Sequence, residues 1–247
     1  MKLSKMYMVK SGDFNVAWLT AINNVLKSDT DVVFGSAEEP KYIKDSCQVI
    51  ELTGNAIDQM SDGILHPDFS FKSIDQYKQE FDVDFLAGYN DWPEEKKFTY
   101  LYIERIVQYR GKNKTIDQLK VLRDQLEDQI NNRIASNRSQ AITWEPEVDV
   151  VNNASPCMQR IWSRWVGEKN EVNFADLHLD WRSRDLFNAW QPNLIAITWM
   201  MNKYVYGPNN CKLCRLIDKN DSLHIYRGDV ESARGIVEKR LPFVMRY

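Results

Sequence analysis

Three short polar clusters in the second half of the chain hold side chains that can carry out covalent and binding chemistry. They are Pro156-Cys157, Arg182-Ser183-Arg184-Asp185 and His224-Ile225-Tyr226. A cysteine offers a thiolate nucleophile, an arginine offers a planar fork for phosphate, and a histidine titrates near neutral pH. Polar residues at the ends of strands commonly hold ligands, so we expect these clusters to belong to a binding or catalytic site.

Each cluster alone also fits a purely structural role. A single cysteine that enters a strand is more often a small buried hydrophobe than a nucleophile. Asp185 could stabilise the first turn of a helix, and His224 with Tyr226 could form a solvated strand face. The functional interpretation therefore depends on the joint occurrence of the three clusters.

The composition predicts a soluble globular protein that handles a small ligand. The 247 residues are 43% apolar and 12% aromatic, which is enough to bury one large core, and 27% are charged. The net charge is −3, and the charged residues form no long block of one sign. The sequence therefore does not indicate a binding surface for DNA, other nucleic acid or a membrane. Neither a secretory leader nor an apolar stretch of membrane-spanning length is evident, so we expect a cytoplasmic protein.

In a reducing cytoplasm the cysteines are expected to be thiols; they are Cys47, Cys157, Cys211 and Cys214. Cys211-Lys-Leu-Cys214 has the spacing of half a zinc site, but a structural zinc site needs four ligands and no second pair follows. We therefore interpret this segment as a loop with two thiols and expect no metal.

The periodicity of apolar residues predicts the elements that position the clusters. Apolar residues three and four apart predict helices over 13–27, 70–86, 116–134 (with Thr115 as the N-cap) and 185–204. Alternating or continuous apolar runs predict strands over 44–53, 140–144, 159–166, 174–182 and 222–226, and Gly63 and Pro67 mark a connection. Because no repeat or linker divides the chain, we expect a single α+β domain over 1–247, with helices covering a mixed β-sheet.

Taken together and in this order, the motifs resemble the thymidylate synthase family. The residues that carry the resemblance are Tyr102, Asn137-Arg138, Trp144, Pro156-Cys157, Arg182-Ser183-Arg184-Asp185, Asn193 and His224-Ile225-Tyr226. The stretch from Trp144 to Asn193 is similar in spacing as well as in residue type. The resemblance implies a thymidylate synthase-like fold and a homodimer formed through the sheet.

The resemblance also implies catalytic roles. Cys157 would add to carbon 6 of a pyrimidine nucleotide and so make carbon 5 nucleophilic, as an enolate; nearby arginines would favour ionisation of a thiol whose ordinary pKa is about 8.5. Asn193 would meet the O4 and N3–H edge of uracil and stabilise that enolate. Tyr102 would lie near the proton that leaves carbon 5.

The acid–base glutamate of the family is harder to place. Glu80 stands about where the pattern puts it, and Glu94 or Glu95 are alternatives because they lie closer to Tyr102 in the sequence. Each of the three could equally be an exposed carboxylate without a catalytic role.

The substrate-binding set implied by the resemblance is Arg138, Arg182, Ser183, Asp185, His224 and Tyr226. Arginine and serine would bind the 5′-phosphate, with Arg138 reaching in from the other subunit of the homodimer. The histidine and the tyrosine would contact the ribose, and the aspartate would contact the pterin of the folate.

The sequence departs from the family pattern in several places. Asn137-Arg138 replaces two adjacent arginines, which weakens the phosphate grip unless Arg133 or Arg184 supplements it. Met158 follows the cysteine where histidine is frequent, and the closing tail of the family is not recognisable at the end of the chain.

The leading hypothesis is a transferase of nucleotide biosynthesis that methylates dUMP to dTMP with 5,10-methylenetetrahydrofolate. The alternative is a hydroxymethylase acting on dUMP or dCMP, in which water adds in place of hydride. Asn193 favours uracil, because cytosine-specific relatives tend to carry an aspartate there. A hypothesis of another class is a non-catalytic homologue that binds nucleotide or RNA, which the weakened phosphate set suggests.

Overall fold

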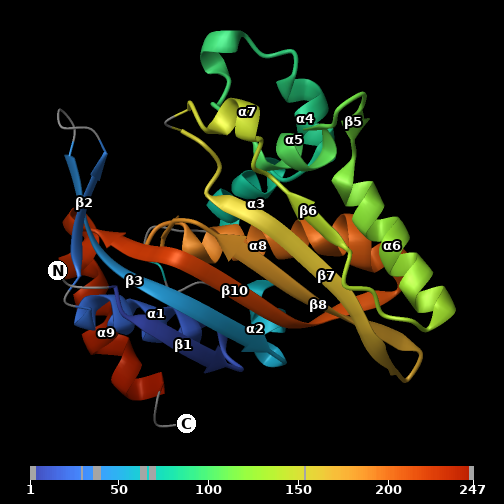
Figure 1. Ribbon diagram of the computed structural model, residues 1–247. Coiled ribbons are helices and arrows are strands. Elements are labelled where there is room, and N and C mark those ends of the chain that lie inside the picture. Colours follow the sequence, from blue (N-terminus) through green and yellow to red (C-terminus); the bar gives the residue numbers. More distant parts are fainter. Residues whose placement is uncertain are drawn as a thin grey trace. The chain divides into compact units, whose positions relative to one another are not determined.

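The computed structural model shows an α+β chain in which helices cover a large mixed β-sheet (Figure 1). It describes residues 4–28, 30–35, 40–61, 66, 71–152 and 154–244. The chain forms two compact units: unit 1 comprises Met1–Asp68, Trp181–Asn193 and Arg215–Tyr247, and unit 2 comprises Phe69–Asp180 and Leu194–Cys214. The expected single domain stays a prediction.

Unit 1 contains the strands β1, β3 and β10 in that order, with β2 on the first half of β3 and β9 beside β10. Their bounds are β1 (Met6–Ser11), β2 (Asp31–Gly35), β3 (Pro40–Thr53), β9 (Arg184–Asp185) and β10 (Cys211–Tyr226), of which unit 1 holds the part from Arg215 onward. β1 runs parallel to β3, whereas β2 and β10 run antiparallel to it. The sheet is therefore mixed, as expected.

Helix α1 (Phe14–Lys27) confirms the helix predicted over 13–27 and joins β1 to the parallel strand β3, a connection that a hairpin cannot make. The Asp13 carboxylate caps it by accepting from the Val16 N–H at 2.8 Å. The apolar stripe of α1 is fully buried, including Phe14, Trp18 and Ile22. Figure 1 shows α1 against β1 and β3, with α9 (Val230–Val244) packed on α1; the short helix α2 (Asn55–Asp58) follows β3.

Unit 2 contains the strand order β10-β8-β7-β6 and a group of helices. Its strands are β4 (Tyr109–Arg110), β5 (Thr115–Ile116), β6 (Gln140–Ile142), β7 (Met158–Lys169) and β8 (Val172–Trp181, of which Trp181 belongs to unit 1). Its helices are α3 (Phe71–Gln79), α4 (Val83–Tyr89), α5 (Tyr102–Val107), α6 (Gln118–Asn132) and α7 (Pro146–Asp149). Helix α8 (Trp190–Met201) has its first residues in unit 1 and the rest in unit 2.

Helix α6 packs against β6, the last strand of this order. Its buried stripe, Leu119, Leu122 and Leu126, packs on β7, β6 and α5. The Gln118 amide exchanges two hydrogen bonds with the main chain of Ile142, at 2.8 and 2.9 Å. These bonds satisfy main-chain groups of β6 that no further strand of this order pairs.

The start of α6 corrects one expectation. Asp117, not Thr115, is the N-cap, because the Asp117 carboxylate accepts from the Lys120 N–H at 2.9 Å. Thr115 instead pairs with Arg110 in the β4–β5 ladder, which leaves its main chain extended. The helix ends at Asn132, since Arg133 adopts the left-handed conformation with φ 56°.

Two further expectations are corrected. The helix predicted over 70–86 is two helices, α3 and α4, because Asp82 caps a new helix by accepting from the Asp84 N–H at 3.0 Å. The segment interpreted as a loop with two thiols, Cys211 to Cys214, is the beginning of β10, and the strand predicted over 222–226 is its end. Gly63, Pro67 and Ser70 lie outside the described residues.

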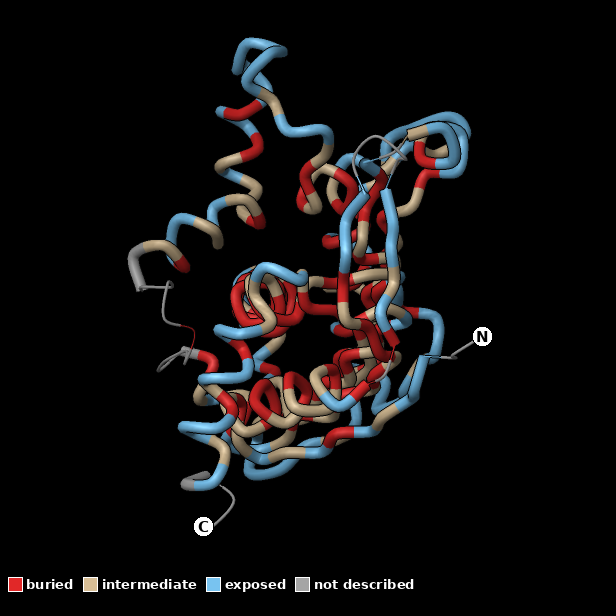
Figure 2. Tube along the Cα trace, turned by 90° about the vertical axis from the view of Figure 1, so that its left-hand side faces the viewer, coloured by how far each residue is buried: buried red, intermediate tan, exposed pale blue. Residues whose placement is uncertain are grey.

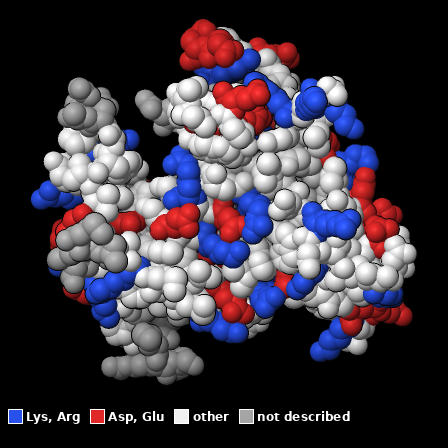
Figure 3. Space-filling view, viewed as in Figure 1, with Lys and Arg blue, Asp and Glu red and all other residues white. Residues whose placement is uncertain are grey.

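Burial and charge follow the arrangement of the elements. Figure 2 shows buried positions along strands and on one side of helices, with exposed positions in loops. On the face drawn in Figure 3, lysines and arginines are interspersed with aspartates and glutamates. Within the described ranges, no helix has both the length and the apolar character needed to cross a bilayer.

Replacing Asp117 with alanine tests the corrected cap. We expect the Asp117→Ala variant to lose about 1 kcal/mol of unfolding free energy, the usual cost of removing an N-cap acceptor. Thr115→Ala is the matched control and should change the unfolding free energy by less than about 0.5 kcal/mol. Urea unfolding followed by circular dichroism measures both, and an equal loss in the two variants would contradict the assignment.

Candidate active site

Unit 2 brings Cys157 and Tyr102 together at the start of β7. Cys157 is half-buried and directly precedes the strand, and the Met158 N–H donates to the Tyr102 hydroxyl at 3.3 Å. Burial raises the pKa of Tyr102 well above its ordinary value of 10, and the neighbouring Tyr100 and Cys157 add to the rise. The Tyr102 phenol therefore keeps its proton at neutral pH, beside the candidate nucleophile.

A small pocket of about 150 Å³ lies beside Tyr102 in the same unit. Glu80, which directly follows α3, lines it together with the aromatic side chains of Tyr77, Phe81, Phe98, Tyr100 and Tyr102. The rings of Phe81 and Tyr102 stack at 5.7 Å. Burial raises the pKa of Glu80, so this carboxyl holds its proton to higher pH than an exposed glutamate.

The alternative carboxylates lie in a different environment. Glu94 and Glu95 are exposed on a 3₁₀ turn, and Glu94 forms an ion pair with Lys97 at 3.3 Å with its side chain 89% exposed. Of the three candidates, Glu80 is the one that lines the pocket with Tyr102. Exposed carboxylates act mainly as surface charges, and Glu80 as the acid–base residue stays a prediction.

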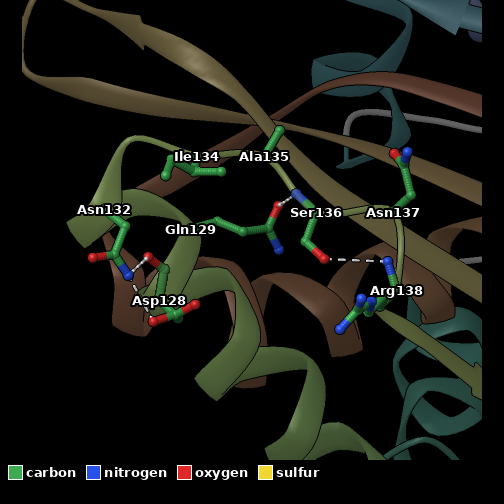
Figure 4. Close-up of a pocket in the computed structure, with 8 residues that line it drawn as sticks. All are labelled: Asp128, Gln129, Asn132, Ile134, Ala135, Ser136, Asn137 and Arg138. Carbon is green, nitrogen blue, oxygen red and sulfur yellow. Dashed lines mark hydrogen bonds between the residues drawn. The ribbon is translucent and has the colours of Figure 1, made fainter.

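Arg138 lies elsewhere in unit 2, at a separate open pocket of about 450 Å³ (Figure 4). The pocket is formed by the last turn of α6 and the loop that follows, and the Arg138 N–H donates to the Ser136 hydroxyl at 3.3 Å. The side chain of Asn137 accepts from Arg164 at 3.1 Å, and its carbonyl accepts from Trp162 at 3.0 Å. Asn137 therefore anchors this loop to β7.

The remaining expected site residues belong to unit 1. Asp185 in β9 accepts from the N–H groups of Phe187 and Asn188 at 2.9 and 3.0 Å, and its second oxygen accepts from the Asn188 side chain at 3.1 Å. These bonds fix the turn between β9 and α8, which is why the helix predicted from residue 185 begins only at Trp190. Arg182 is exposed and Ser183 is half-buried in the segment just before β9.

Arg184 does not supplement a phosphate grip, because its guanidinium is buried in an ion pair. Its Nη1 donates to Asp218 at 2.8 Å, and the two side chains are 1% and 0% exposed. Nη2 donates to the Trp190 carbonyl at 3.0 Å, and the group lies 3.9 Å from the centre of the Trp181 ring. Arg133 is likewise engaged in unit 2, in an ion pair with Glu168.

Asn193 stands in the first turn of α8, three residues after Trp190, and is 6% exposed. The Trp190 indole donates to the second oxygen of Asp218 at 2.8 Å. Asp218 therefore holds both β9, through Arg184, and the start of the helix that carries Asn193. The roles of Asn193, Arg182 and Ser183 toward a ligand stay predictions.

His224 and Tyr226 share one face of β10, as predicted, with their rings edge-on at 5.2 Å. The solvated alternative is wrong for His224, which is 3% exposed. Burial lowers the pKa of His224, so its ring is neutral at pH 7. Phe34 of β2 lies within 6.2 Å of both rings.

Sequence reasoning missed the aromatic neighbours in both units. Tyr77 and Phe81 lie four apart around Glu80, and Tyr100 alternates with Tyr102, so spacing alone could have grouped them with the carboxyl. Phe34 had no such signal, because it reaches His224 through the pairing of β2 with β3 and of β3 with β10.

The cysteines outside the candidate site show no metal-binding arrangement. Cys211 is buried, which raises its pKa to about 12, and the Cys214 thiol donates to the Ala175 carbonyl at 3.3 Å. The four cysteines, all in the described part of the chain, form no disulfide. Among the residues that the structure describes, no three His, Cys, Asp or Glu side chains are grouped to hold a metal ion.

Comparison with known proteins finds archaeal relatives at low identity. Proteins named "Putative thymidylate synthase" from Methanothermobacter marburgensis and Methanosarcina barkeri are both 23% identical to the chain, over 69% and 94% of its length. One from Methanopyrus kandleri is 29% identical over 52% of the chain and 56% of its own length. The match spans 66% of the Methanothermobacter marburgensis protein and 94% of the Methanosarcina barkeri protein. No family model matches. These similarities support a thymidylate synthase-like family without indicating a particular member.

Breaking the Arg184–Asp218 pair should destabilise the protein strongly. Asp218→Ala leaves a buried guanidinium without its counter-charge, and we expect a loss of about 3–5 kcal/mol of unfolding free energy in urea. Replacing both partners, as Arg184→Met with Asp218→Leu, should recover part of that loss, because no uncompensated charge remains while the Trp190 indole and the Asn220 amide still lack their acceptor. Lys78→Ala, which breaks the exposed Asp75–Lys78 pair, is the control and should cost less than about 1 kcal/mol. A small effect of Asp218→Ala would contradict the structural role.

Proposed function

We propose that the chain is a folate-dependent one-carbon transferase that alkylates carbon 5 of dUMP, as a thymidylate synthase does. One structural observation carries the proposal: Glu80 and Tyr102 line the same aromatic pocket, and Tyr102 binds the main chain of the residue after Cys157. A thiol nucleophile and groups that transfer protons are what addition at carbon 6 and proton loss at carbon 5 require. The names of the archaeal relatives support the same reaction class.

In this proposal the Cys157 thiolate forms a bond to carbon 6 of uracil, and the electrons of the 5,6 double bond move toward O4 as an enolate. Asn193 hydrogen-bonds the O4 and N3–H edge and stabilises that charge. After carbon 5 has been alkylated its proton passes to the Glu80 carboxylate, with the Tyr102 phenol as a hydrogen-bond donor nearby. The folate nitrogen would leave the one-carbon unit, and that carbon would accept hydride for methylation or water for hydroxymethylation. Expulsion of the Cys157 thiolate then restores the double bond.

The polar residues of unit 1 serve binding in this proposal. Arg182 and Ser183 bind the 5′-phosphate, because guanidinium and hydroxyl groups donate to phosphate oxygens. His224 and Tyr226 contact the ribose, and Asp185 contacts the pterin of the folate.

The aromatic surroundings of the Glu80 pocket fit the flat rings of a folate. Phe98 is 51% exposed and stacks on Tyr89 at 6.0 Å with 7° between the ring planes, and Trp92 is 41% exposed and 5.2 Å from Tyr89. Exposed, rigid rings of this kind bind flat heterocycles. When bound, 5,10-methylenetetrahydrofolate supplies the one-carbon unit and, for methylation, the hydride.

We include a homodimer in the proposal, with Arg138 completing the phosphate site of the second subunit. The exposed position of Arg138 allows this role. Trp162 and Arg164 of β7 and His178 of β8 form a half-buried polar face, with rings 4.5 Å apart and the guanidinium 5.1 Å from the indole. Tryptophan and arginine are enriched in protein interfaces, so this face is the one that we assign to the partner.

Tritium release from dUMP labelled at carbon 5 tests the proposed reaction. The wild-type protein should release tritium with methylenetetrahydrofolate, and Cys157→Ser should lower the rate at least about 10⁴-fold, because a hydroxyl cannot replace the thiolate. Cys47→Ser is the matched control and should release tritium at the wild-type rate. Dihydrofolate formation in the same reaction identifies methylation, whereas release without dihydrofolate identifies hydroxymethylation.

Two outcomes would contradict the proposal. Turnover by Cys157→Ser would mean that another group is the nucleophile. Absence of release from folded protein that binds dUMP would leave the non-catalytic binding hypothesis.

Glu80→Gln should separate activity from stability. We expect tritium release to fall about 10²–10⁴-fold, the usual contribution of an acid–base group. The raised pKa of Glu80 means that its contribution to stability is greatest below about pH 4.3, the ordinary value, and is lost as the pH rises through the folded-state pKa. The glutamine side chain does not titrate, so its stability does not fall in this way. The unfolding free energy of the variant minus that of the wild type should therefore be larger at pH 7 than at pH 4.

Thermal melts at the two pH values and initial rates of tritium release measure these effects. Glu94→Gln is the control and should alter neither, since that carboxylate is exposed. Full activity in Glu80→Gln would remove Glu80 from the proposed mechanism.

A further inference from the structure

His224 is held between two strands, which fixes where its ring lies. In the β3–β10 ladder its partner is Asp45, and on the other side β9 pairs with it at Asp185. The Leu186 N–H donates to the His224 carbonyl at 2.8 Å. The main chain of His224 is therefore bonded on both sides, which fixes the direction in which its side chain leaves the strand.

A β-bulge places Ser222 next to this ring. The register between β3 and β10 shifts between Asn220 and Leu223, so Ser222 lies outside the regular ladder. Its hydroxyl donates to Asp45 Oδ1 at 2.6 Å and lies 3.5 Å from His224 Nδ1. The other Asp45 oxygen accepts from the Ser4 hydroxyl at 3.0 Å, and the residue is 7% exposed.

These contacts determine which nitrogen of His224 carries the proton. A carboxylate only accepts hydrogen bonds, and a serine hydroxyl has a single proton, so the proton of Ser222 is committed to Asp45. The Ser222 oxygen then presents a lone pair to Nδ1, which favours a proton on Nδ1. The Ser222 main chain also hydrogen-bonds the ring and favours its protonated form, which agrees with an N–H on the same nitrogen.

The other ring nitrogen is left with an unused capacity to accept. Nε2 of His224 is buried and has no hydrogen-bond partner among the residues that the structure describes. Because burial lowers the pKa of His224, the ring carries one proton, and with that proton on Nδ1 the Nε2 atom has a lone pair only. Buried polar atoms without a partner are uncommon in folded proteins, and this one, beside a candidate site, is able to accept a hydrogen bond from a ligand group.

We propose that Asp45 and Ser222 are positioning residues that hold His224 in the Nδ1–H tautomer, so that Nε2 accepts a hydrogen bond from a hydroxyl group of the ligand. The identity of that hydroxyl rests on the proposed function, in which it is the 3′-hydroxyl of dUMP. Asp45 and Ser222 touch no substrate in this account and act through the histidine.

The groups packed around the ring are consistent with a neutral acceptor. Asp45 of β3 and Asp185 of β9 are the acidic groups near it, and both favour the protonated ring, but burial outweighs them. Phe34 of β2 and Tyr226 of β10 cover the ring with their own rings, at 6.1 and 5.2 Å between centres. A hydroxyl is a small donor that can reach a nitrogen in such surroundings.

Nitrogen-15 NMR of the full chain labelled at histidine tests the tautomer without any substrate. The chain has three histidines, and the signal of His224 is assigned from its loss in His224→Gln. We expect Nε2 of His224 to resonate as an unprotonated nitrogen in the wild type. In Ser222→Ala the two nitrogens should move part of the way toward each other, because the hydroxyl acceptor at Nδ1 is gone and only the Ser222 main chain is left beside it, whereas Ser222→Thr should keep the wild-type pattern.

Dissociation constants for two nucleotides test the ligand group. We expect 2′,3′-dideoxyuridine 5′-phosphate to bind the wild type about 5- to 10-fold more weakly than dUMP, as expected for one lost hydrogen bond. In Ser222→Ala and Asp45→Leu, which remove the hydroxyl and its acceptor, the two nucleotides should differ by only about 2- to 3-fold, since Nε2 is less firmly fixed as an acceptor. Ser4→Ala is the control and should keep the wild-type ratio, because it leaves the bond between Asp45 and Ser222 intact. Thermal melts show whether each variant is folded.

The outcomes separate the two proposals. A protonated Nε2 in the wild type, or an unchanged tautomer in Ser222→Ala, overturns the positioning role whatever the protein catalyses. The expected tautomer with equal binding of the two nucleotides overturns the assignment to the dUMP hydroxyl. A third outcome is that the wild type releases no tritium but shows the expected tautomer and the expected ratio of dissociation constants. This outcome contradicts the proposed reaction and supports the positioning role.

Discussion

The buried ion pair between Arg184 and Asp218 is the interaction on which the geometry of unit 1 depends. Two charges removed from water carry a large desolvation cost, which is offset only when they are paired with good geometry and further hydrogen bonds. Here one carboxylate serves Arg184, the Trp190 indole and the Asn220 amide, the last two at 2.8 Å each. Strand β9, the start of α8 and the middle of β10 therefore share one point of attachment. This attachment also positions the neighbours of Arg184 along the chain, Ser183 and Asp185. It positions Asn193 as well, through the first turn of α8.

Unit 2 positions its candidate groups by a different means. Aromatic rings, not charges, surround Glu80 and Tyr102, and the Phe81 ring stacks on Tyr102. Rings of this size exclude water and have few rotamers, so they hold a phenol and a carboxyl in place while raising the pKa of both. As a result, the Tyr102 phenol keeps its proton, and the Glu80 carboxyl holds its proton to higher pH than an exposed glutamate does. Glu80 differs from Glu94 and Glu95 in this environment, because those two glutamates are exposed at the surface.

The sequence predicted the parts of the fold that depend on local periodicity. Helix α1 and the strands β3, β7 and β8 follow from apolar spacing, because one face of each is buried against a neighbour. The failures have non-local causes. Thr115 has the side chain of a good cap, but its pairing with Arg110 in a two-residue ladder removed it from the helix. Cys211 to Cys214 lacks a clean alternation, since Cys211 is buried, Lys212 is exposed and the next two residues are both half-buried. The sequence around Arg184 likewise has no pattern that predicts its burial. For the candidate site, the sequence identified the chemistry-bearing side chains but not their surroundings, since Phe34, Asp45 and Ser222 reach His224 only through strand pairing and a bulge.

The protonation states of the candidate groups have a common cause. Burial keeps His224 neutral, keeps the Tyr102 phenol protonated and raises the pKa of Glu80, so in each case the low-polarity environment opposes charge. Groups held uncharged in this way act through hydrogen bonds and through single proton transfers, and they do not compete with a substrate anion for cationic side chains. The side chains of Arg138 and Arg182, by contrast, lie at exposed positions of their units. The reaction proposed above requires such a division, with neutral groups for the sugar and for the proton transfers and cations for the phosphate.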